Sequence, residues 1–246
     1  MPELDMTVDQ GTLSDAIGAL HTLVDECRVH IDDGGLHVAA VEPANSAMVH
    51  LDMPDRATES YQADGDHVIG VDLETLADIV GLFDGLVNVE LDGRDLYLRD
   101  GRLEARIATI TPDSVRDEPD KPDLDLTALA VVESGEWMRA ITAAGVIDTT
   151  SLTIIARSDQ VRFEVAGDSD DATITLDETD LELLDVDSAA EAMYSLDFLE
   201  EITRPMPSDA GVRIEFADEY PIDVSYSVAA GAVSVEYTLA PRIRSD

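Results

Sequence analysis

The side chains of this chain that could perform chemistry do not form a known catalytic or metal-binding pattern. Three carboxylates stand close together, at Asp168, Asp170 and Asp171, and carboxylate oxygens are ligands that calcium prefers. The spacing lacks the glycine and the downstream glutamate of a calcium-binding helix-loop-helix site. We therefore expect a solvated turn at this place and no bound metal.

The other reactive side chains are equally uninformative. None of the five histidines stands in a His-Glu-x-x-His arrangement, and their positions favour structural or surface roles: His21, His30, His37, His50 and His67. The chain has neither a Gly-x-Ser-x-Gly elbow nor a phosphate-binding glycine loop. The one cysteine, Cys27, excludes an intrachain disulfide and favours a buried side chain at the start of a strand. We expect no catalytic residues and no cofactor.

The charge balance is the strongest compositional signal. Lys and Arg total 15 against 54 Asp and Glu, for a formal charge of −39, and Lys121 is the only lysine. A hydrophobic fraction of 45% argues against disorder. Such a surface suits near-molar salt, where the Debye length is about 3 Å and self-repulsion is screened. A basic partner is the rival explanation, but the acids are spread along the whole chain.

The amino-terminal sequence and the hydropathy indicate where in the cell the protein is expected. Residues 1–5 carry neither a basic region nor an apolar run, so we expect no signal peptide. No segment has the length of a membrane span. We therefore expect a cytoplasmic protein that does not bind membranes.

The sequence contains an internal repeat of one unit, at an offset of 125 residues. Leu36-His37-Val38 aligns with Val161-Arg162-Phe163, and Val49-His50-Leu51 aligns with Ile174-Thr175-Leu176. The same shift predicts that Val71-Asp72-Leu73 matches Leu196-Asp197-Phe198, and that Val87, Val89 and Leu91 match Val212, Ile214 and Phe216. A duplication of this kind favours a scaffold with repeated geometry over a single asymmetric active site.

Each half is expected to contain a strand, a helix, three or more strands, a second helix and closing strands. Helical spacing of apolar residues occurs at Leu13, Ile17, Leu20 and Val24, at Leu73, Leu76, Ile79, Val80 and Phe83, at Trp137, Ile141 and Ala144, and at Leu196, Leu199 and Ile202. Hairpin signals surround residues 34–35 and 92–93, and prolines at 205 and 207 end the last helix.

A proline-rich, charged segment separates the two halves. It lacks apolar periodicity, and its composition is typical of an extended, partly stiff linker. We predict an N-terminal domain at 1–111, a connector at 112–126 and a C-terminal domain at 127–246. Two units rich in antiparallel hairpins predict an α+β fold with the helices on one face of each sheet.

Five blocks, taken in order, resemble the archaeal sliding clamps of the proliferating cell nuclear antigen family. The last of them, residues 236–243, is similar to the carboxy-terminal motif of that family, in which Leu-Ala-Pro precedes a basic residue and isoleucine. The other four blocks are residues 41–49, 61–80, 166–170 and 194–199. The resemblance covers essentially the whole chain, and each block alone would be a weak signal.

The resemblance implies the DNA clamp fold, in which two duplicated domains carry helices that line a central hole and antiparallel sheets outside. Three identical subunits would close into a ring around duplex DNA, without regard to sequence. DNA polymerase, the clamp loader, flap endonuclease and ligase would dock through short peptide motifs during replication and repair. A clamp of this family performs no chemistry itself.

The resemblance also assigns the functional residues. A docking groove would be formed by Val41, Ser46, Met48, Leu124, Leu126, Pro221, Thr238, Ala240 and Pro241. The sequence departs from the family pattern at three places, which should make the groove more polar: Ser46 stands in place of valine, Thr238 in place of a second tyrosine, and Lys121 in place of an isoleucine.

The resemblance implies that basic side chains on the helices face the DNA, and here these are His21, Arg139 and Arg204. Four further positions that are basic in the family are occupied by Ser14, Asp15, Asp78 and Gly81. A solvated helix face is the alternative for both arginines. The ring seam would pair strand 103–110 of one subunit with strand 172–177 of the next, through Leu103, Arg106, Ile107, Ile110, Thr173, Ile174 and Thr175.

One other functional class stays open at this point. A carboxylate-dependent hydrolase or metal-binding enzyme of a salt-adapted cell would share the composition. The duplication disfavours it, because it leaves no single asymmetric constellation of side chains. Solution mass in molar potassium chloride separates the two, since the clamp should be a trimer.

Overall fold

The computed structural model describes residues 2–118, 121–147 and 149–243. Residues 119–120 of the predicted connector, and the outermost residues of both predicted domains, lie outside this description. The chain divides into two compact units. Unit 1 comprises Met1–Asp120 and Ser227–Val235, and unit 2 comprises Lys121–Tyr226 and Glu236–Asp246. A segment near the carboxy terminus thus belongs to unit 1, which the predicted division at 1–111, 112–126 and 127–246 did not include.

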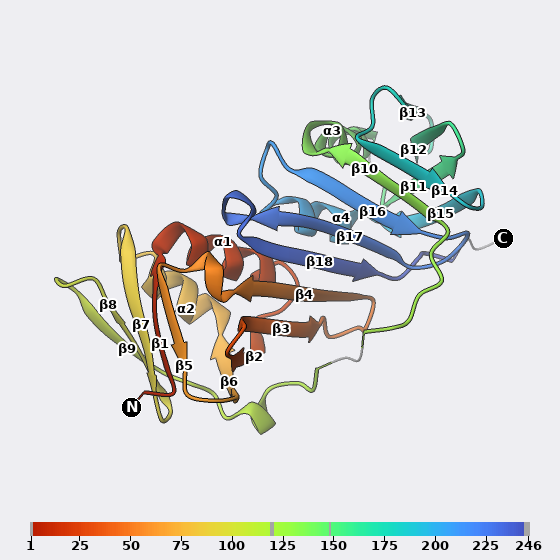
Figure 1. The fold of residues 1–246 in the computed structure, drawn as a ribbon. Helices are drawn as coiled ribbons and strands as arrows, with labels where there is room; N and C mark the ends of the chain where they lie inside the picture. Colours follow the sequence, from red (N-terminus) through yellow and green to blue (C-terminus); the bar gives the residue numbers. More distant parts are fainter. Residues whose placement is uncertain (1, 119–120, 148, 244–246) are drawn as a thin grey trace. The chain divides into compact units, whose positions relative to one another are not determined.

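Unit 1 packs helices α1 (Gln10–His21) and α2 (Leu73–Val80) over antiparallel strands (Figure 1). One sheet has the strand order β5-β1-β7-β8-β9, and a second run has the order β4-β3-β2-β6. The strands are β1 (Leu4–Asp9), β2 (Glu26–Asp32), β3 (Gly35–Val41), β4 (Ala47–Pro54), β5 (Ser60–Ala63), β6 (His67–Asp72), β7 (Leu86–Asp92), β8 (Asp95–Arg99) and β9 (Glu104–Ala108). Short 3-10 turns lie at η1 (Asp55–Ala57), η2 (Pro112–Ser114) and η3 (Ala229–Gly231).

Unit 2 repeats this plan with α3 (Ser134–Ile147) and α4 (Leu196–Thr203). Its strands form the runs β14-β10-β16-β17 and β13-β12-β11-β15. They are β10 (Ala128–Glu133), β11 (Ser151–Arg157), β12 (Gln160–Ala166), β13 (Asp171–Asp177), β14 (Leu183–Val186), β15 (Ala190–Ser195), β16 (Gly211–Phe216), β17 (Ile222–Val228) and β18 (Val233–Leu239), and the last two strands are divided between the units. The element order expected for each half is confirmed.

Local sequence signals set the helix ends. The Asp9 carboxylate accepts from the Gly11 N–H at 2.9 Å, and the Asp72 carboxylate accepts from the Thr75 N–H at 2.7 Å, so both helices of unit 1 begin at a side-chain cap. Helix α4 ends at Thr203, before Pro205 and Pro207, as predicted. Helices α1 and α2 end earlier than the apolar spacing predicted, at His21 and Val80.

The duplication is confirmed, with two corrections. In β1 and β7 the partners Leu4 and Leu91 correspond to Ala128 and Phe216 in β10 and β16, so the predicted match of the β7 and β16 residues holds. Two predicted matches are wrong. Val49-His50-Leu51 does not match Ile174-Thr175-Leu176, because Val38 faces Leu51 whereas its counterpart Phe163 faces Ile174. Val71-Asp72-Leu73 does not match Leu196-Asp197-Phe198. Val71 lies in β6 whereas Leu196 begins α4, and the two second helices start 123 residues apart.

The slip arises at the turn between β3 and β4, which is two residues longer than the turn between β12 and β13. Val41 faces Met48 across the first turn, whereas Ala166 faces Asp171 across the second. Strands β6 and β15 begin at His67 and Ala190, which are 123 residues apart, whereas β2 and β11 begin 125 residues apart. The proline-containing turn after α4 then runs longer than the turn after α2, so that β7 and β16 return to the offset of 125. The offset of 125 therefore holds for β2, β3 and β7, but it fails from β4 to the second helix.

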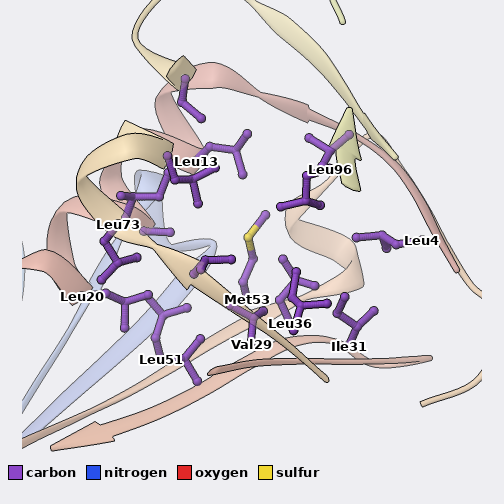
Figure 2. Close-up of a pocket in the computed structure, with 18 of the residues that line it drawn as sticks. Leu4, Leu13, Leu20, Val29, Ile31, Leu36, Leu51, Met53, Leu73 and Leu96 are labelled. Carbon is purple, nitrogen blue, oxygen red and sulfur yellow. The ribbon is translucent and has the colours of Figure 1, made fainter. Parts of the chain in front are cut away.

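The core of unit 1 is largely aliphatic, with Phe83 as a buried aromatic ring, and contains a cavity of about 90 Å³ beneath its helices. Figure 2 shows that the lining side chains come from both layers, with Leu13 and Leu73 from the helices and Val29 and Met53 from the strands. The walls are apolar throughout. A void of this kind stays dry, because a water inside would find no hydrogen-bond partners.

The core of unit 2 is aromatic. Trp137 of α3 is fully buried and meets the Phe163 ring edge-on, with 6.1 Å between ring centroids and 87° between ring planes. The Trp137 indole N–H donates to the Thr203 hydroxyl at 2.8 Å, which joins α3 to α4. Tyr194 and Tyr237 are also fully buried. Each buried ring removes a large apolar area from water.

Cys27 is buried in β2, as predicted. Burial raises the pKa of its thiol to about 12, helped by the nearby charges of Glu118 and Glu26. Because only the thiolate is an effective nucleophile, this side chain is inert at neutral pH.

Candidate functional site

The predicted groove residues of unit 1 surround the β3–β4 turn. Val41 and Met48 are opposite partners across the two strands, and both are half-buried. Ser46 is half-buried just before β4, and its N–H donates to the Glu42 carboxylate at 2.5 Å. Two partly exposed apolar side chains therefore flank a turn whose backbone is held by a buried glutamate.

In unit 2, Thr238 and Pro221 lie beside a buried carboxylate. The Thr238 hydroxyl donates to Asp223 at 2.5 Å, and both residues are buried. Burial raises the pKa of Asp223 above its ordinary value, while the hydrogen bond from Thr238 opposes the shift. Pro221 is half-buried directly before β17.

The second part of the predicted connector is anchored to the same strands. The Lys121 ammonium group pairs with the Glu236 carboxylate on β18. Leu124 and Leu126 are half-buried, whereas the intervening Asp125 is exposed. This alternation leaves two leucines with part of their surface accessible.

Ala240 and Pro241 follow β18 at the surface. Ala240 is exposed, and Pro241 lines a hollow of about 650 Å³ in unit 2. Arg242 fixes this end, because its backbone N–H donates to the Met193 carbonyl at 2.6 Å and its guanidinium donates to the Thr150 carbonyl at 2.6 Å. The other walls are Glu191, Ala192, Met193, Asp218, Glu219 and Ile243.

The comparisons with known proteins agree with one another. The family described as proliferating cell nuclear antigen, N-terminal domain, matches residues 3–96. A DNA polymerase sliding clamp of Natronomonas pharaonis is 41% identical over 97% of this chain and 98% of its own length. One of Halobacterium salinarum is 40% identical over the same shares. The chain belongs to the DNA polymerase sliding clamp family.

Solved structures confirm the clamp fold. The structure described as the C-terminal region of FEN-1 bound to A. fulgidus PCNA has a TM-score of 0.94 and 33% identity, and it covers 99% of this chain and 100% of that one. PCNA from Thermococcus kodakaraensis has a TM-score of 0.89 at 22% identity, covering 97% and 100%. The α+β clamp fold with two duplicated domains is therefore established for this chain, and its relatives include clamps of salt-loving archaea.

Two of the three departures from the clamp pattern belong to one polar cluster. Thr238 hydrogen-bonds Asp223, and Lys121 pairs with Glu236, whose charge also acts on Asp223. A hydroxyl at position 238 thus satisfies a buried carboxylate that an apolar side chain would leave unpaired. Ser46 is the third departure, and no contact of its side chain explains it.

The predicted seam residues lie on two edge strands. Among the described residues, β9 pairs only with β8 and β13 pairs only with β12 within their sheets. Leu103 precedes β9, Arg106 and Ile107 lie in it, and Thr173, Ile174 and Thr175 lie in β13. Arg106 already meets a carboxylate of its own chain, Asp95, at 2.9 Å.

The predicted seam strand 103–110 is too long. Strand β9 ends at Ala108, and Ile110 forms a two-way bridge with Gly70, with N···O distances of 2.8 and 3.0 Å. A Cβ on Gly70 would come within 2.9 Å of the Ile110 carbonyl oxygen, so this close approach needs glycine. The backbone of Ile110 is consequently used within the chain.

The three predicted DNA-facing residues each have an acidic neighbour. Arg139 Nη1 lies 3.3 Å from Glu136, Arg204 Nη1 lies 2.7 Å from Glu201, and His21 Nε2 lies 3.9 Å from Asp25. All are at helical spacings of three or four residues. Arg139 also lines a hollow with the seam residues of β13.

Sequence reasoning missed two sets of residues at these sites. Asp223 and Glu236 form the polar cluster with Thr238 and Lys121, and Arg28 and Arg116 bind the backbone around the first part of the connector. The acidic residues gave no signal, because carboxylates are common throughout the chain. The two arginines did give a signal in the sequence, because basic residues are rare in this protein: it has only 14 arginines and a single lysine among 246 residues.

Proposed function

We propose that this clamp encircles duplex DNA as a closed ring of three identical subunits and tethers replication enzymes through a peptide-docking groove. The observation that carries the proposal is the relative seen with the C-terminal region of FEN-1, which shares 33% identity and a TM-score of 0.94 with this chain. Peptide capture of this kind fills pockets with apolar anchors.

The groove residues support this proposal from both units. Unit 1 offers the half-buried pair Val41 and Met48, and unit 2 offers Pro221, Pro241 and the half-buried leucines 124 and 126. Partly exposed apolar side chains gain stability when a partner covers them, and the gain survives high salt because it is not Coulombic. DNA polymerase, the clamp loader, flap endonuclease and ligase are the proposed clients.

The ring rests on the two edge strands. An unpaired strand edge invites pairing with another chain, and β9 and β13 each have one free edge among the described residues. We propose that β9 of one subunit pairs with β13 of the next, through the seven seam residues expected from the sequence. Because Ile110 is bridged to Gly70, it would contribute its side chain and not a ladder hydrogen bond.

DNA would be held by topology more than by charge. His21, Arg139 and Arg204 face the DNA in this proposal, but each has an acidic neighbour that offsets its charge. In molar salt, counterion release adds little to DNA binding. Domain boundaries near residues 111 and 127, a cytoplasmic location and the absence of any chemistry of its own are part of the same proposal. No helix within the described ranges combines the length and apolar character needed to cross a membrane.

A paired substitution tests the groove. Changing Ala240→Glu and Pro241→Glu together should abolish binding of a client's aromatic-anchored peptide, measured by fluorescence anisotropy in molar potassium chloride, while light scattering still shows a trimer. The control adds the same charge at two exposed turn positions of unit 2, Ser188→Glu and Ser208→Glu, and should bind normally. Wild-type affinity in the groove variant would place the docking site elsewhere.

Salt dependence tests the ring. Because each chain carries −39, dilution lengthens the Debye length and strengthens repulsion between subunits. Light scattering should show trimers in molar potassium chloride and smaller species at tens of millimolar. A trimer fraction that rises on dilution would contradict this account.

A further inference from the structure

Arg116 joins the first part of the connector to the β3–β4 turn. Its guanidinium donates from Nη1 to the Glu42 carbonyl at 3.1 Å and from Nη2 to the Asn45 side-chain oxygen at 2.7 Å. Both acceptors are neutral, and they lie on either side of the turn. A planar guanidinium fork can hold two such acceptors at once, which a lysine cannot do with the same geometry.

Hydrogen bonds among its own residues also stabilise the turn. The Glu42 carboxylate accepts from the Ala44 N–H at 2.6 Å and from the Ser46 N–H at 2.5 Å. Asn45 adopts a φ of 60°, a left-handed conformation that asparagine tolerates better than most residues. Its N–H donates to the Glu42 carbonyl, the same oxygen that Arg116 binds. Arg116 therefore acts on a turn with one preferred shape.

The connector residues on both sides of Arg116 are fixed to the sheet. Arg28 of β2 donates to the Pro112 carbonyl at 2.9 Å, to the Val115 carbonyl at 3.0 Å and to Asp117 at 2.8 Å. Val115 is buried, and His30 pairs with Glu118. Residues 112–118 are consequently held on both sides of Arg116.

We propose that Arg116 is a positioning residue for client docking: it holds the β3–β4 turn, residues 42–46, in its binding shape before a peptide arrives. The inference rests on the proposed groove, because Val41, Ser46 and Met48 stand at or beside this turn. A binding site that is ordered in advance loses less conformational entropy on association. The connector then serves as a brace for unit 1 as well as a link between units.

Salt separates this role from attraction of an acidic client by the Arg116 charge. Hydrogen bonds from a guanidinium to a carbonyl and an amide oxygen are local and are little affected by screening, whereas long-range attraction fades within a Debye length. Long-range attraction is already screened at one molar potassium chloride, so a charge role predicts almost no loss there. Loss of positioning should instead weaken binding by the same factor at one and at three molar.

The first test replaces Arg116→Gln in the full-length clamp. The side chain is exposed, so folding should be unaffected. We expect client-peptide affinity to fall about 5-fold to 10-fold at both salt concentrations, and amide exchange of residues 44 and 46 in the free clamp to accelerate. Arg56→Gln is the control, because it removes one exposed positive charge from η1, at the opposite end of β3.

A second variant separates positioning from direct contact with the client. Asn45→Gly removes the amide acceptor and keeps the left-handed backbone. It should weaken peptide binding less than Arg116→Gln, and the double variant should bind about as well as Arg116→Gln alone. Additive losses would show that the two residues do not act through one another.

The outcomes are decisive in each direction. Faster amide exchange with unchanged affinity, or weaker binding with unchanged exchange, would overturn the positioning role, the second by indicating that Arg116 touches the client itself. Failure of the proposed groove looks different, because wild type, Arg56→Gln and the Ser188/Ser208 control would then all fail to bind the peptide.

Discussion

The two units place the same elements in the same order, but they fill the space beneath their helices with different side chains. Trp137, Phe163 and Tyr194 in unit 2 correspond to Leu13, Val38 and Val71 in unit 1, as the strand partners show: Leu152 faces Tyr194 where Cys27 faces Val71. All three of the smaller residues line the cavity of unit 1.

This difference teaches how the cavity arose within a duplicated fold. The copy with aliphatic residues at these three positions leaves a cavity, whereas the other copy has large aromatic rings there. Protein interiors are otherwise close-packed, and an unfilled volume forfeits dispersion contacts. We therefore expect the core of unit 2 to be the more tightly packed of the two.

The largest expected effect is in the aromatic core. Trp137→Ala should cost about 3–5 kcal/mol, because it deletes a fully buried ring and its hydrogen bond to Thr203. The matched change Leu13→Ala should cost about 2 kcal/mol, at the low end for a buried leucine, since its side chain already borders a void. Hydrogen exchange of peptides from each unit, in molar salt, measures both losses separately. Equal losses would break the comparison.

The next effect concerns helix caps. Asp72 caps α2 through Thr75, whereas Ser195 makes no side-chain cap at α4. Asp72→Ala should lower the free energy of unfolding by about 1 kcal/mol, and Ser195→Ala should change it by a few tenths at most. Denaturant midpoints of both variants check this. A cost at Ser195 as large as that at Asp72 would contradict the assigned difference.

A smaller effect is expected from filling the cavity. Val38→Ile adds one methylene group beside the void and should stabilise unit 1 by about 0.5 kcal/mol. Val49→Ile is the control, because Val49 is fully buried on β4 and does not line the cavity. That variant should be destabilised through overpacking. Thermal unfolding of the pair would sharpen the comparison, and stabilisation of both would show that the void does not decide the outcome.

The smallest expected effect is the pH dependence of Asp223. Its folded-state pKa is raised by burial, so its ionised form lowers stability at neutral pH, and this loss is relieved as the pH falls through the folded pKa. Asp223→Asn, which keeps an acceptor for Thr238, should be as stable as wild type or more so at pH 7, and the difference should vanish below the ordinary pKa of 3.8.

Asp72 provides the contrast of opposite sign. The hydrogen bond from the Thr75 N–H lowers the pKa of this carboxyl, so its stabilisation is present above the ordinary pKa and is lost as the pH falls through the folded value. The cost of Asp72→Ala should therefore shrink in acid. Identical pH profiles for the two positions would refute both assignments.

Periodicity in the sequence predicted the helices and hairpins because each depends on neighbours a few residues away. The helix residues Leu13, Ile17 and Leu20 are buried together, and the β2–β3 hairpin forms around the expected glycines. The carboxy-terminal motif led to the family through residues that are also adjacent in the chain. These signals involve residues that are close together in the chain, so they can be recognised from the sequence alone.

The remaining features depend on residues far apart in the sequence. The cavity requires Leu13, Val38 and Val71 to face one another, and the polar cluster requires Asp223 to meet Thr238. The misplaced match at Leu196 came from loops whose lengths differ between the copies. Arg116 reaches back more than seventy residues to Glu42. None of these contacts produces a periodic pattern in the sequence from which it could be predicted.

The central claim is that this chain acts as a sliding clamp that holds DNA by encircling it. The most direct measurement loads the labelled clamp, with its clamp loader, onto nicked circular DNA and in parallel onto the same DNA made linear, and then isolates the DNA in molar potassium chloride. The account predicts that the clamp stays on the circles and slides off the linear molecules. Equal retention on both forms, or loss from both, would contradict it.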